Sequence, residues 1–481
     1  MAESFSMQIP SDVLALMEVL ENAGHEVYVV GGCVRDAMLG KVPHDYDMCT
    51  SATPTQIKEA MRAAGYKTYD TGIQHGTISV NNHDELYEIT TFRIDGEYSD
   101  GRHPDRVIFT TNLIDDLSRR DFTINAMAYN YKVGLIDPYD GATDLDKKII
   151  RCVGNPVDRM NEDALRILRG VRLSAKYGLT FEPMTFAAME ETKTLLDLLA
   201  PERVQAELMQ LITISPSEVL ETSKTIMAQI IPDLELTYEF PEDMYCRVKN
   251  LWKLTLETLD NVWEDLVLKL AALLQNIGRP STYQIVNGVG QSPGYCEKTV
   301  AMADKILRDL KFDNQTRKNV LDVLRYQDKP ITKDPAVLKA VMNKIGVDNT
   351  NRLSKLLIAN TIAYQKVRDV SGMTPEEIRK ENEKISEKLK QLYKTEQRIA
   401  EIVVNKEPYR LQDLAIKGND ILELGVPEPK DVGVILNTLL KDVLKHPEHN
   451  NKEFLLNKTE KEIAKLEQTR DNDFTLFDDI E

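Results

Sequence analysis

The chain has 481 residues, too many for one ordinary domain, and this length predicts three or four domains. Hydrophobic residues make up 42% and charged residues 28%, as in soluble globular proteins, and no apolar run approaches the roughly 18 residues of a membrane span. The net charge of −17 argues against a protein that coats nucleic acid, although a local basic stripe can still attract phosphate.

The first predicted elements are a strand at Val27–Val30, a glycine turn ending at Gly32, a helix start with Arg35, and a second strand with Asp45 and Asp47. Residues two apart on a strand share a face, so the two carboxylates project together as hard oxygen ligands that suit Mg²⁺. The glycines have no Cβ, so a phosphate could approach the backbone N–H groups that open the helix. For Asp-x-Asp alone a surface turn with solvated acids is the better interpretation, but the whole unit favours a nucleotide and metal site.

This unit resembles the nucleotidyltransferase signature shared by tRNA CCA-adding enzymes and bacterial poly(A) polymerases of the DNA polymerase β superfamily, and the resemblance covers nearly the whole chain. It implies an α+β protein. An N-terminal mixed-sheet, polymerase β-like nucleotidyltransferase head is followed by an all-helical neck, body and tail. We expect the catalytic head at residues 1–150, the neck with base recognition at 151–215, the body at 216–373, and the tRNA-binding tail at 374–481.

Further strands are expected in the head at residues 77–80, 86–92, 107–110 and 135–137. Glu88, on the second of these, is a candidate third catalytic acid near the metals, and an ordinary edge-strand acid is an equal alternative. The stretch Asp95–Pro104 has two glycines, a proline and no apolar face, which predicts a mobile loop. In the family that the chain resembles, this loop lies beside the active site and is needed for the switch from C to A addition.

The segment Arg119–Ala126 resembles the second motif of the family. Two adjacent arginines are by themselves most simply a solvated pair. The resemblance implies that Arg120 contacts the triphosphate or ribose, with Asp121 and Asn125 as supports. The turn Asp137–Gly141 matches the third motif and is expected to be structural.

A single helix is predicted across residues 162–172, with an apolar side and a stripe that displays Asp163, Arg166, Arg169 and Arg172. A carboxylate only accepts hydrogen bonds and a guanidinium only donates them. Cytosine and adenine each place an amino donor beside a ring-nitrogen acceptor, so one Asp–Arg pair can satisfy either base, whereas uracil and guanine present the reverse. An exposed arginine helix with i,i+3 ion pairs is the alternative interpretation.

The resemblance implies that Glu162, Asp163 and Arg166 form the base-templating motif, and that Arg169 and Arg172 face phosphates of nucleotide or RNA. Downstream, the segment 202–207 matches the fifth motif of the family. There we expect Arg203 to pair with Glu207 and to brace the neck helices.

The run Leu270–Pro280 resembles the signature of HD-type phosphohydrolases, but Gln275 and Asn276 occupy the positions of the His-Asp pair. Cys296 and Gln327 stand where further histidines would be expected. Because amides are poor ligands for such metals, we expect a degenerate HD-like body without that chemistry. An unrelated helical bundle is the alternative.

The tail begins with a strongly charged helix at residues 376–402, whose i,i+4 pairs indicate a solvated or partner-facing strut. Residues 408–465 resemble the C-terminal region of bacterial CCA-adding enzymes. They contain a modest basic surface that could hold the tRNA elbow, although a plain solvated face is an equal alternative. Its residues are Lys430, Lys441, Lys445 and His446.

The resemblance implies template-independent addition of CCA to the 3′ end of tRNA from CTP and ATP, with Asp45 and Asp47 holding two Mg²⁺ ions and with release of pyrophosphate. The alternatives are an A-adding enzyme, a poly(A) polymerase and a non-catalytic RNA-binding protein. The start of the chain lacks a signal-peptide pattern and its five cysteines include no Cys-x-x-Cys pair, so we expect a cytoplasmic protein without a membrane segment or zinc site.

Overall fold

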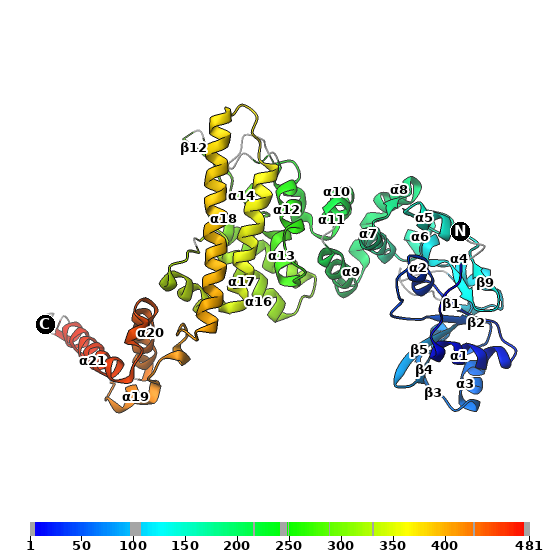
Figure 1. The fold of residues 1–481 in the computed structure, drawn as a ribbon, viewed down its shortest axis with the longest axis horizontal. Helices are drawn as coiled ribbons and strands as arrows, with labels where there is room; N and C mark the ends of the chain where they lie inside the picture. The colour runs from blue at the N-terminus through cyan, green and yellow to red at the C-terminus, as the bar shows by residue number, and fades with distance from the viewer. Residues whose placement is uncertain are drawn as a thin grey trace. The chain divides into compact units, whose positions relative to one another are not determined.

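The computed structural model describes residues 5–96, 107–214, 217–240, 248, 250–287, 289–329, 331–426 and 429–475. Its contacts divide the chain into two compact units, Met1–Glu235 and Leu236–Glu481, and each is described by itself (Figure 1). Within the described ranges, no helix is both long and apolar enough to cross a membrane.

The first unit is built on a seven-stranded mixed sheet in the order β3-β4-β5-β2-β1-β8-β9. Strands β2 and β5 run parallel, and all other neighbours are antiparallel. The strands are β1 (Val27–Val30), β2 (Met48–Thr50), β3 (Lys67–Gly72), β4 (Thr77–Asn82), β5 (Glu85–Thr91), β8 (Ala128–Asn130) and β9 (Gly134–Ile136). This sheet confirms the expected mixed-sheet head.

Two strands of this sheet were not expected from the sequence. Strand β3 is almost wholly exposed, so its residues lack the apolar alternation by which a strand is recognised. Strand β8 has only three residues, all buried, which is too short for a periodic signal. A separate ribbon pairs β6 (Arg93–Asp95) with β7 (Val107–Phe109), and β10 (Ile149–Ile150) pairs with β11 (Thr180–Phe181).

The helices of the first unit are short, and α7 packs against α9. They are α1 (Ser11–Asn22), α2 (Gly32–Met38), α3 (Pro54–Ala63), α4 (Leu113–Ser118), α5 (Gly141–Asp146), α6 (Pro156–Glu162), α7 (Leu165–Tyr177), α8 (Pro183–Thr192), α9 (Pro201–Thr213), α10 (Ser217–Thr222) and α11 (Lys224–Ile230).

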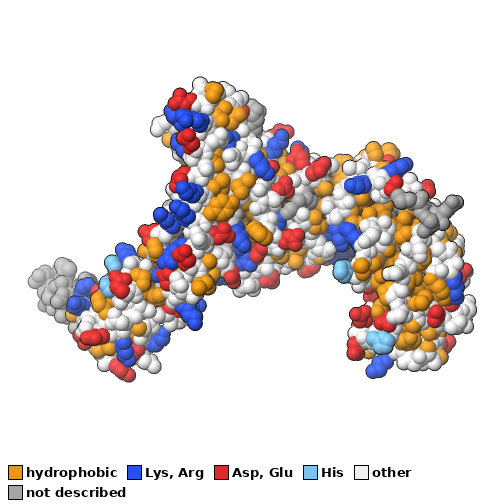
Figure 2. Space-filling view, viewed as in Figure 1, with side chains coloured by type: hydrophobic (Ala, Val, Ile, Leu, Met, Phe, Trp, Pro, Cys, Tyr) orange, Lys and Arg blue, Asp and Glu red, His pale blue; other side chains and the backbone are white. Residues whose placement is uncertain are grey.

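Over its described residues the second unit is almost entirely helical, with one short hairpin of β12 (Gln284–Val286) and β13 (Val289–Gln291). Its helices are α12 (Leu251–Asp260), α13 (Leu266–Leu274), α14 (Arg279–Thr282), α15 (Tyr295–Asp309), α16 (Asn314–Tyr326), α17 (Pro335–Val367), α18 (Pro375–Val404), α19 (Gly418–Glu423), α20 (Pro429–Lys445) and α21 (Lys452–Thr475). Figure 2 shows basic and acidic side chains interspersed over this unit, as a mixed charge composition predicts.

The long charged helix expected in the tail is α18, and it begins with a capping box in which Thr374 and Glu377 bond each other's backbone N–H groups. One side buries residues such as Leu392 and Ile399, and the helix packs along α17. The exposed side carries i,i+4 pairs such as Glu376–Lys380 at 2.8 Å. The helix is therefore solvated on one side only.

Candidate active site

A cavity of about 440 Å³ lies in the first unit, between the β1–α2 turn and helices α7 and α9. Seven arginines and three aspartates line it, so the site carries an excess of positive charge that suits a polyanion such as a triphosphate. These charged residues are Arg35, Asp47, Arg119, Arg120, Asp121, Asp163, Arg166, Arg169, Arg172 and Arg203. Gly31, Gly32 and Asn125 also line the cavity, whereas Asp45, Glu88, Glu162 and Glu207 are not among its lining residues.

The β1–α2 turn requires a glycine at position 31. Gly31 has a φ of +78°, a conformation that side chains rarely adopt. A Cβ atom there would also lie only 3.0 Å from Nη1 of Arg120. The glycine therefore allows the Arg120 guanidinium to approach the backbone at the start of α2.

The two predicted metal-binding aspartates lie immediately before strand β2, which begins at Met48 and not at the aspartates as expected. The backbone there is already paired, because Val30 donates its N–H to the Asp47 carbonyl at 3.0 Å. Tyr46 is buried while Asp45 and Asp47 are exposed, so the two carboxylates do share a side of the chain. The pairing of Met48 with Ile89 in the parallel β2–β5 ladder places Asp47 beside Glu88.

The Asp47 carboxyl is unusually difficult to ionise. Desolvation by partial burial, together with the charges of Asp45 and Glu88, raises its pKa to about 6, and the charge of Arg120 opposes this shift. This incompletely compensated cluster of carboxylates fits a hard divalent cation. Within the described ranges, however, three His or carboxylate ligands come within 4.8 Å of one another only at His446, Glu448 and His449, so the head carboxylates are less tightly gathered.

Asp116 is a buried anchor for the arginine pair that the sequence analysis did not identify. Its carboxylate binds Arg119 at 2.7 Å and Arg120 at 3.3 Å. Burial would raise the Asp116 pKa, but the two guanidinium groups outweigh burial and lower it. Asp116 precedes the two arginines by three and four residues, the spacing of ion pairs on a helix. This spacing could have identified Asp116 from the sequence. Arg120 keeps a buried Nε with no hydrogen-bond partner in the described structure.

A buried polar network joins α2 to α7 through Asp121. This carboxylate accepts from Asn125 at 3.0 Å and from Arg169 at 2.7 and 2.9 Å. Asn125 in turn accepts from Arg35, whose guanidinium donates to the Tyr177 hydroxyl at 2.6 Å. Asp121 and Asn125, which the sequence analysis predicted to be supports, both belong to this network, whereas Tyr177 carried no signal in the sequence.

The expected continuous helix at residues 162–172 is wrong, because α6 ends at Glu162 and α7 begins at Leu165. Asp163 lies between them in an extended conformation (φ −143°) and accepts the Leu165 N–H at 3.1 Å. This local bond offers the backbone an alternative to helical pairing. Asp163 therefore does not belong to the same helical stripe as Arg166.

The ion pairs of the neck also differ from those expected. The predicted Arg203–Glu207 pair does not form: Arg203 binds Asp163 at 3.2 Å, and Glu207 accepts from Arg172 at 2.5 Å. The reason is that α9 packs against α7, so that Glu207 meets Arg172 of α7 and Arg203 meets Asp163 just before α7. The Arg166 guanidinium is bound by Glu162 at 2.7 Å and by the Arg119 carbonyl at 3.0 Å.

Two other predictions concern parts outside this cavity. Most of the expected loop Asp95–Pro104 lies outside the described residues, which stop at Gly96 and resume at Val107. In the second unit, Gln275 and Asn276 follow α13 and are buried, and the Asn276 amide donates to Thr255 at 3.0 Å.

Comparisons with known proteins agree with this geometry. Residues 27–151 match the model of the poly A polymerase head domain, and the sheet described above is the polymerase β-like fold of a nucleotidyltransferase head. The fold also resembles solved CCA-adding enzymes. One is from Bacillus stearothermophilus in complex with CTP (TM-score 0.62, 22% identity, 97% of this chain and 100% of that chain), and another is from Thermotoga maritima complexed with tRNA (TM-score 0.56, 18% identity, 95% and 96%).

Among sequence relatives, the CCA-adding enzyme of Ligilactobacillus salivarius is 33% identical over 457 residues, which are 93% of this chain and 95% of that protein. The CCA-adding enzyme of Levilactobacillus brevis is 46% identical over 211 residues, and there the match spans 44% of this chain and about half, 51%, of that protein. The chain belongs to the family of CCA-adding enzymes.

Proposed function

We propose that the protein adds C, C and A to the 3′ end of tRNA from CTP and ATP without a nucleic-acid template, and that it does so in the cytoplasm. The single observation that carries the proposal is the cavity of the first unit, in which seven arginines face Asp47. Family membership points to the same reaction. The predicted division into head, neck, body and tail, with tRNA held by the tail, is part of this proposal.

In the proposed reaction, the 3′-oxygen of the RNA bonds to the α-phosphorus of the nucleotide as the bond from that phosphorus to pyrophosphate breaks. Asp45 and Asp47 would hold two Mg²⁺ ions, with Glu88 as a neighbouring acid. The raised pKa of Asp47 supports this, since three nearby carboxylates favour a cation among them. Mg²⁺ held by these carboxylates would supply a lower pKa of the 3′-hydroxyl, whose proton would leave to solvent, and positive charge against the phosphates.

The arginines of the cavity position the triphosphate. Arg120, held by Asp116 and close to Gly31, is placed to contact the phosphates or the ribose. Arg35 is fixed from two sides by Asn125 and Tyr177, and Arg169 is fixed by Asp121. A preorganised cluster of this kind stabilises developing charge without reorganising during the reaction.

Base selection is assigned to Asp163 and Arg166, which both line the cavity. Each is already held by another residue, Asp163 by Arg203 and Arg166 by Glu162. These partners orient the two groups and leave capacity for a base, since a carboxylate has about four acceptor sites and a guanidinium five N–H donors. The pair then matches cytosine and adenine and rejects uracil and guanine.

The test is to incubate tRNA transcripts ending at the discriminator base, at C, or at CC with each nucleotide and to sequence the products. In a further reaction with CTP and ATP together, we expect C, C and A on the first transcript, C and A on the second, and A on the third. Addition of A to the CC transcript, with no C added to the other two transcripts, would identify an A-adding enzyme. Long A-tails on unrelated RNA would identify a poly(A) polymerase.

A further inference from the structure

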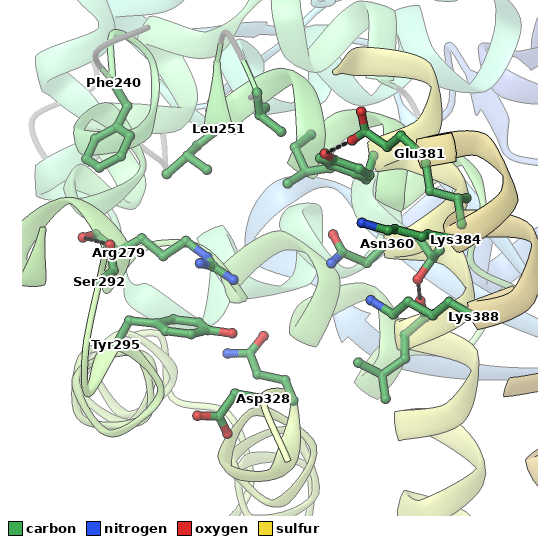
Figure 3. Close-up of a pocket in the computed structure, with 17 residues that line it drawn as sticks. Phe240, Leu251, Arg279, Ser292, Tyr295, Asp328, Asn360, Glu381, Lys384 and Lys388 are labelled. Atoms are coloured by element: carbon green, nitrogen blue, oxygen red, sulfur yellow. Dashed lines mark hydrogen bonds between the residues drawn. The ribbon is translucent and has the colours of Figure 1, made fainter. Parts of the chain in front are cut away.

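The second unit contains a cavity of about 500 Å³ for which the proposed function has no use (Figure 3). Residues from α12, α15, α17 and α18 line it. Its volume lies within the range of small-molecule binding sites, about 300–1,000 Å³. The cavity therefore has the size of a nucleotide site within a body that has lost the HD-type residues.

Three cations converge on this cavity from opposite walls. In Figure 3 Arg279 reaches in from one side, and Lys384 and Lys388 reach in from the facing helix α18. None of the three forms an ion pair with any residue of the described ranges. Because like charges four residues apart on a helix repel each other, an anion between these groups would be stabilising.

The lining also contains two carboxylates, those of Glu381 and Asp328, so the three cations leave an excess of one positive charge. Glu381 accepts a hydrogen bond from the Tyr364 hydroxyl at 2.6 Å, and Asp328 lies below Tyr295 in Figure 3. The Arg279 guanidinium stacks over the Tyr295 ring at 3.8 Å and donates to Asn276 at 3.0 Å. Those contacts fix its plane and leave its terminal N–H groups for a ligand.

The rest of the lining is amphipathic. Phe240, Leu251 and Leu254 form an apolar wall, and all three are buried. Asn360 and Ser292 add an amide and a hydroxyl. Such a site suits a ligand with a flat, largely apolar ring at one end and a strong anion at the other.

We propose that this cavity binds a free organic phosphate of nucleotide size, with the phosphate between Arg279, Lys384 and Lys388 and the base against Phe240 and Leu251. A phosphate of an RNA backbone is the other source of the same anion. It fits less well, since the backbone offers nothing to the apolar wall, and the exposed Glu383 and Glu387 on α18 would repel a polyanion passing there. The proposal is independent of the function assigned to the first unit.

Tryptophan fluorescence provides a selective test. Both tryptophans of the chain, Trp252 and Trp263, lie in the second unit, and the buried Trp252 directly follows Leu251 of the cavity wall. The full-length protein is titrated with AMP in EDTA, and adenosine and inorganic phosphate are titrated in parallel. We expect a saturable signal with AMP, a weaker affinity for phosphate, and none for adenosine.

The variant Lys384→Gln/Lys388→Gln should weaken AMP binding at least about tenfold, since it removes two charge-assisted contacts to the phosphate. The matched control, Lys390→Gln/Lys394→Gln, makes the same charge change on α18 outside the cavity and should bind AMP normally. Equal thermal unfolding of the two variants shows that the fold is retained, and Arg279→Lys provides an independent test from the facing wall.

Three outcomes would overturn the proposal: no saturable signal with AMP, equal affinity in the cavity and control variants, or binding of adenosine as tight as that of AMP. In addition to the titrations with AMP, adenosine and phosphate, the affinity of both variants for tRNA is measured. If the cavity variant loses tRNA affinity while the unchanged protein does not bind AMP, the phosphate comes from RNA and a free nucleotide is excluded.

Discussion

At the scale of single residues, Asp47 carries the chemistry of the proposed site. Asp47→Ala should reduce nucleotide addition by at least about a hundredfold, comparable to the loss of other groups that stabilise transition-state charge. The affinity for tRNA should stay within a few-fold, because the exposed carboxylate supports no part of the fold. Primer-extension rates and filter binding measure the two effects, and Asp146→Ala, an exposed acid on α5, is the control. Near-normal turnover with Mg²⁺ would refute the metal assignment.

Asp163 and Arg166 should determine which base is accepted. Replacing either by Ala should admit UTP or GTP more than it weakens triphosphate binding, because the donor–acceptor match to C and A is lost. The measurement is kcat/KM for all four nucleotides on a tRNA that ends at the discriminator base. Arg203→Ala tests the positioning contact to Asp163, and we expect a smaller loss of selectivity from it. If Asp163→Ala and Arg166→Ala lower all four rates equally, base reading lies elsewhere.

Asp121 links stability to pH. Its burial would raise its pKa, but Arg169 and its hydrogen bonds hold it well below the usual range. A depressed folded-state pKa contributes stability above the unfolded value, about 3.9, and this contribution is lost as the pH falls below it. Asp121→Asn should therefore destabilise the protein at pH 7 by roughly 2 kcal/mol, less than a fully buried pair since Arg169 is 39% exposed. Urea unfolding should show the difference shrinking between pH 5 and pH 3, and a constant difference would contradict the assignment.

At the scale of elements, the packing of α7 against α9 determines the ion pairs of the neck. A double-mutant cycle between Arg172 and Glu207, both nearly buried, should give a coupling of about 1–2 kcal/mol in unfolding free energy. The cycle between Arg203 and Glu207 should give none, since Arg203 binds Asp163. Alanine variants of all three residues provide both cycles from one set of proteins. Coupling between Arg203 and Glu207, with none between Arg172 and Glu207, would instead support the Arg203–Glu207 pair expected from the sequence.

At the scale of the whole molecule, the second unit is expected to have no metal-dependent hydrolase activity. The positions of the HD pair hold Gln275 and Asn276, buried amides that are poor metal ligands. The assay is hydrolysis of 2′,3′-cyclic nucleotides and simple phosphate esters with Ni²⁺, Mn²⁺ or Mg²⁺, and we expect no turnover above that of the metal alone. Activity that survives Asp47→Ala and disappears on changing Gln275 would contradict this.

The sequence by itself determined the features that depend on near neighbours. Strand β1, the Gly31–Gly32 turn and the Asp-x-Asp pair could all be predicted, because alternation along a strand and the freedom of glycine are local properties. The charged helix α18 followed in the same way from its composition and its i,i+4 charge pairs. The mixed-sheet head itself was implied by the resemblance that these motifs carry, since the local signals did not reveal β3 and β8.

Only the tertiary structure decided which charges meet. Asp163 binds Arg203 40 positions away, Glu207 binds Arg172 35 positions away, and Arg35 meets Tyr177 142 positions away. Such pairs form when helices pack, and they cannot be predicted from the spacing of residues along the chain. The convergence of Arg279 with two lysines of α18 has the same origin, since segments far apart in sequence build one cavity. The residue types thus indicated the chemistry of the site, and the packing of the helices determined which charged side chains pair.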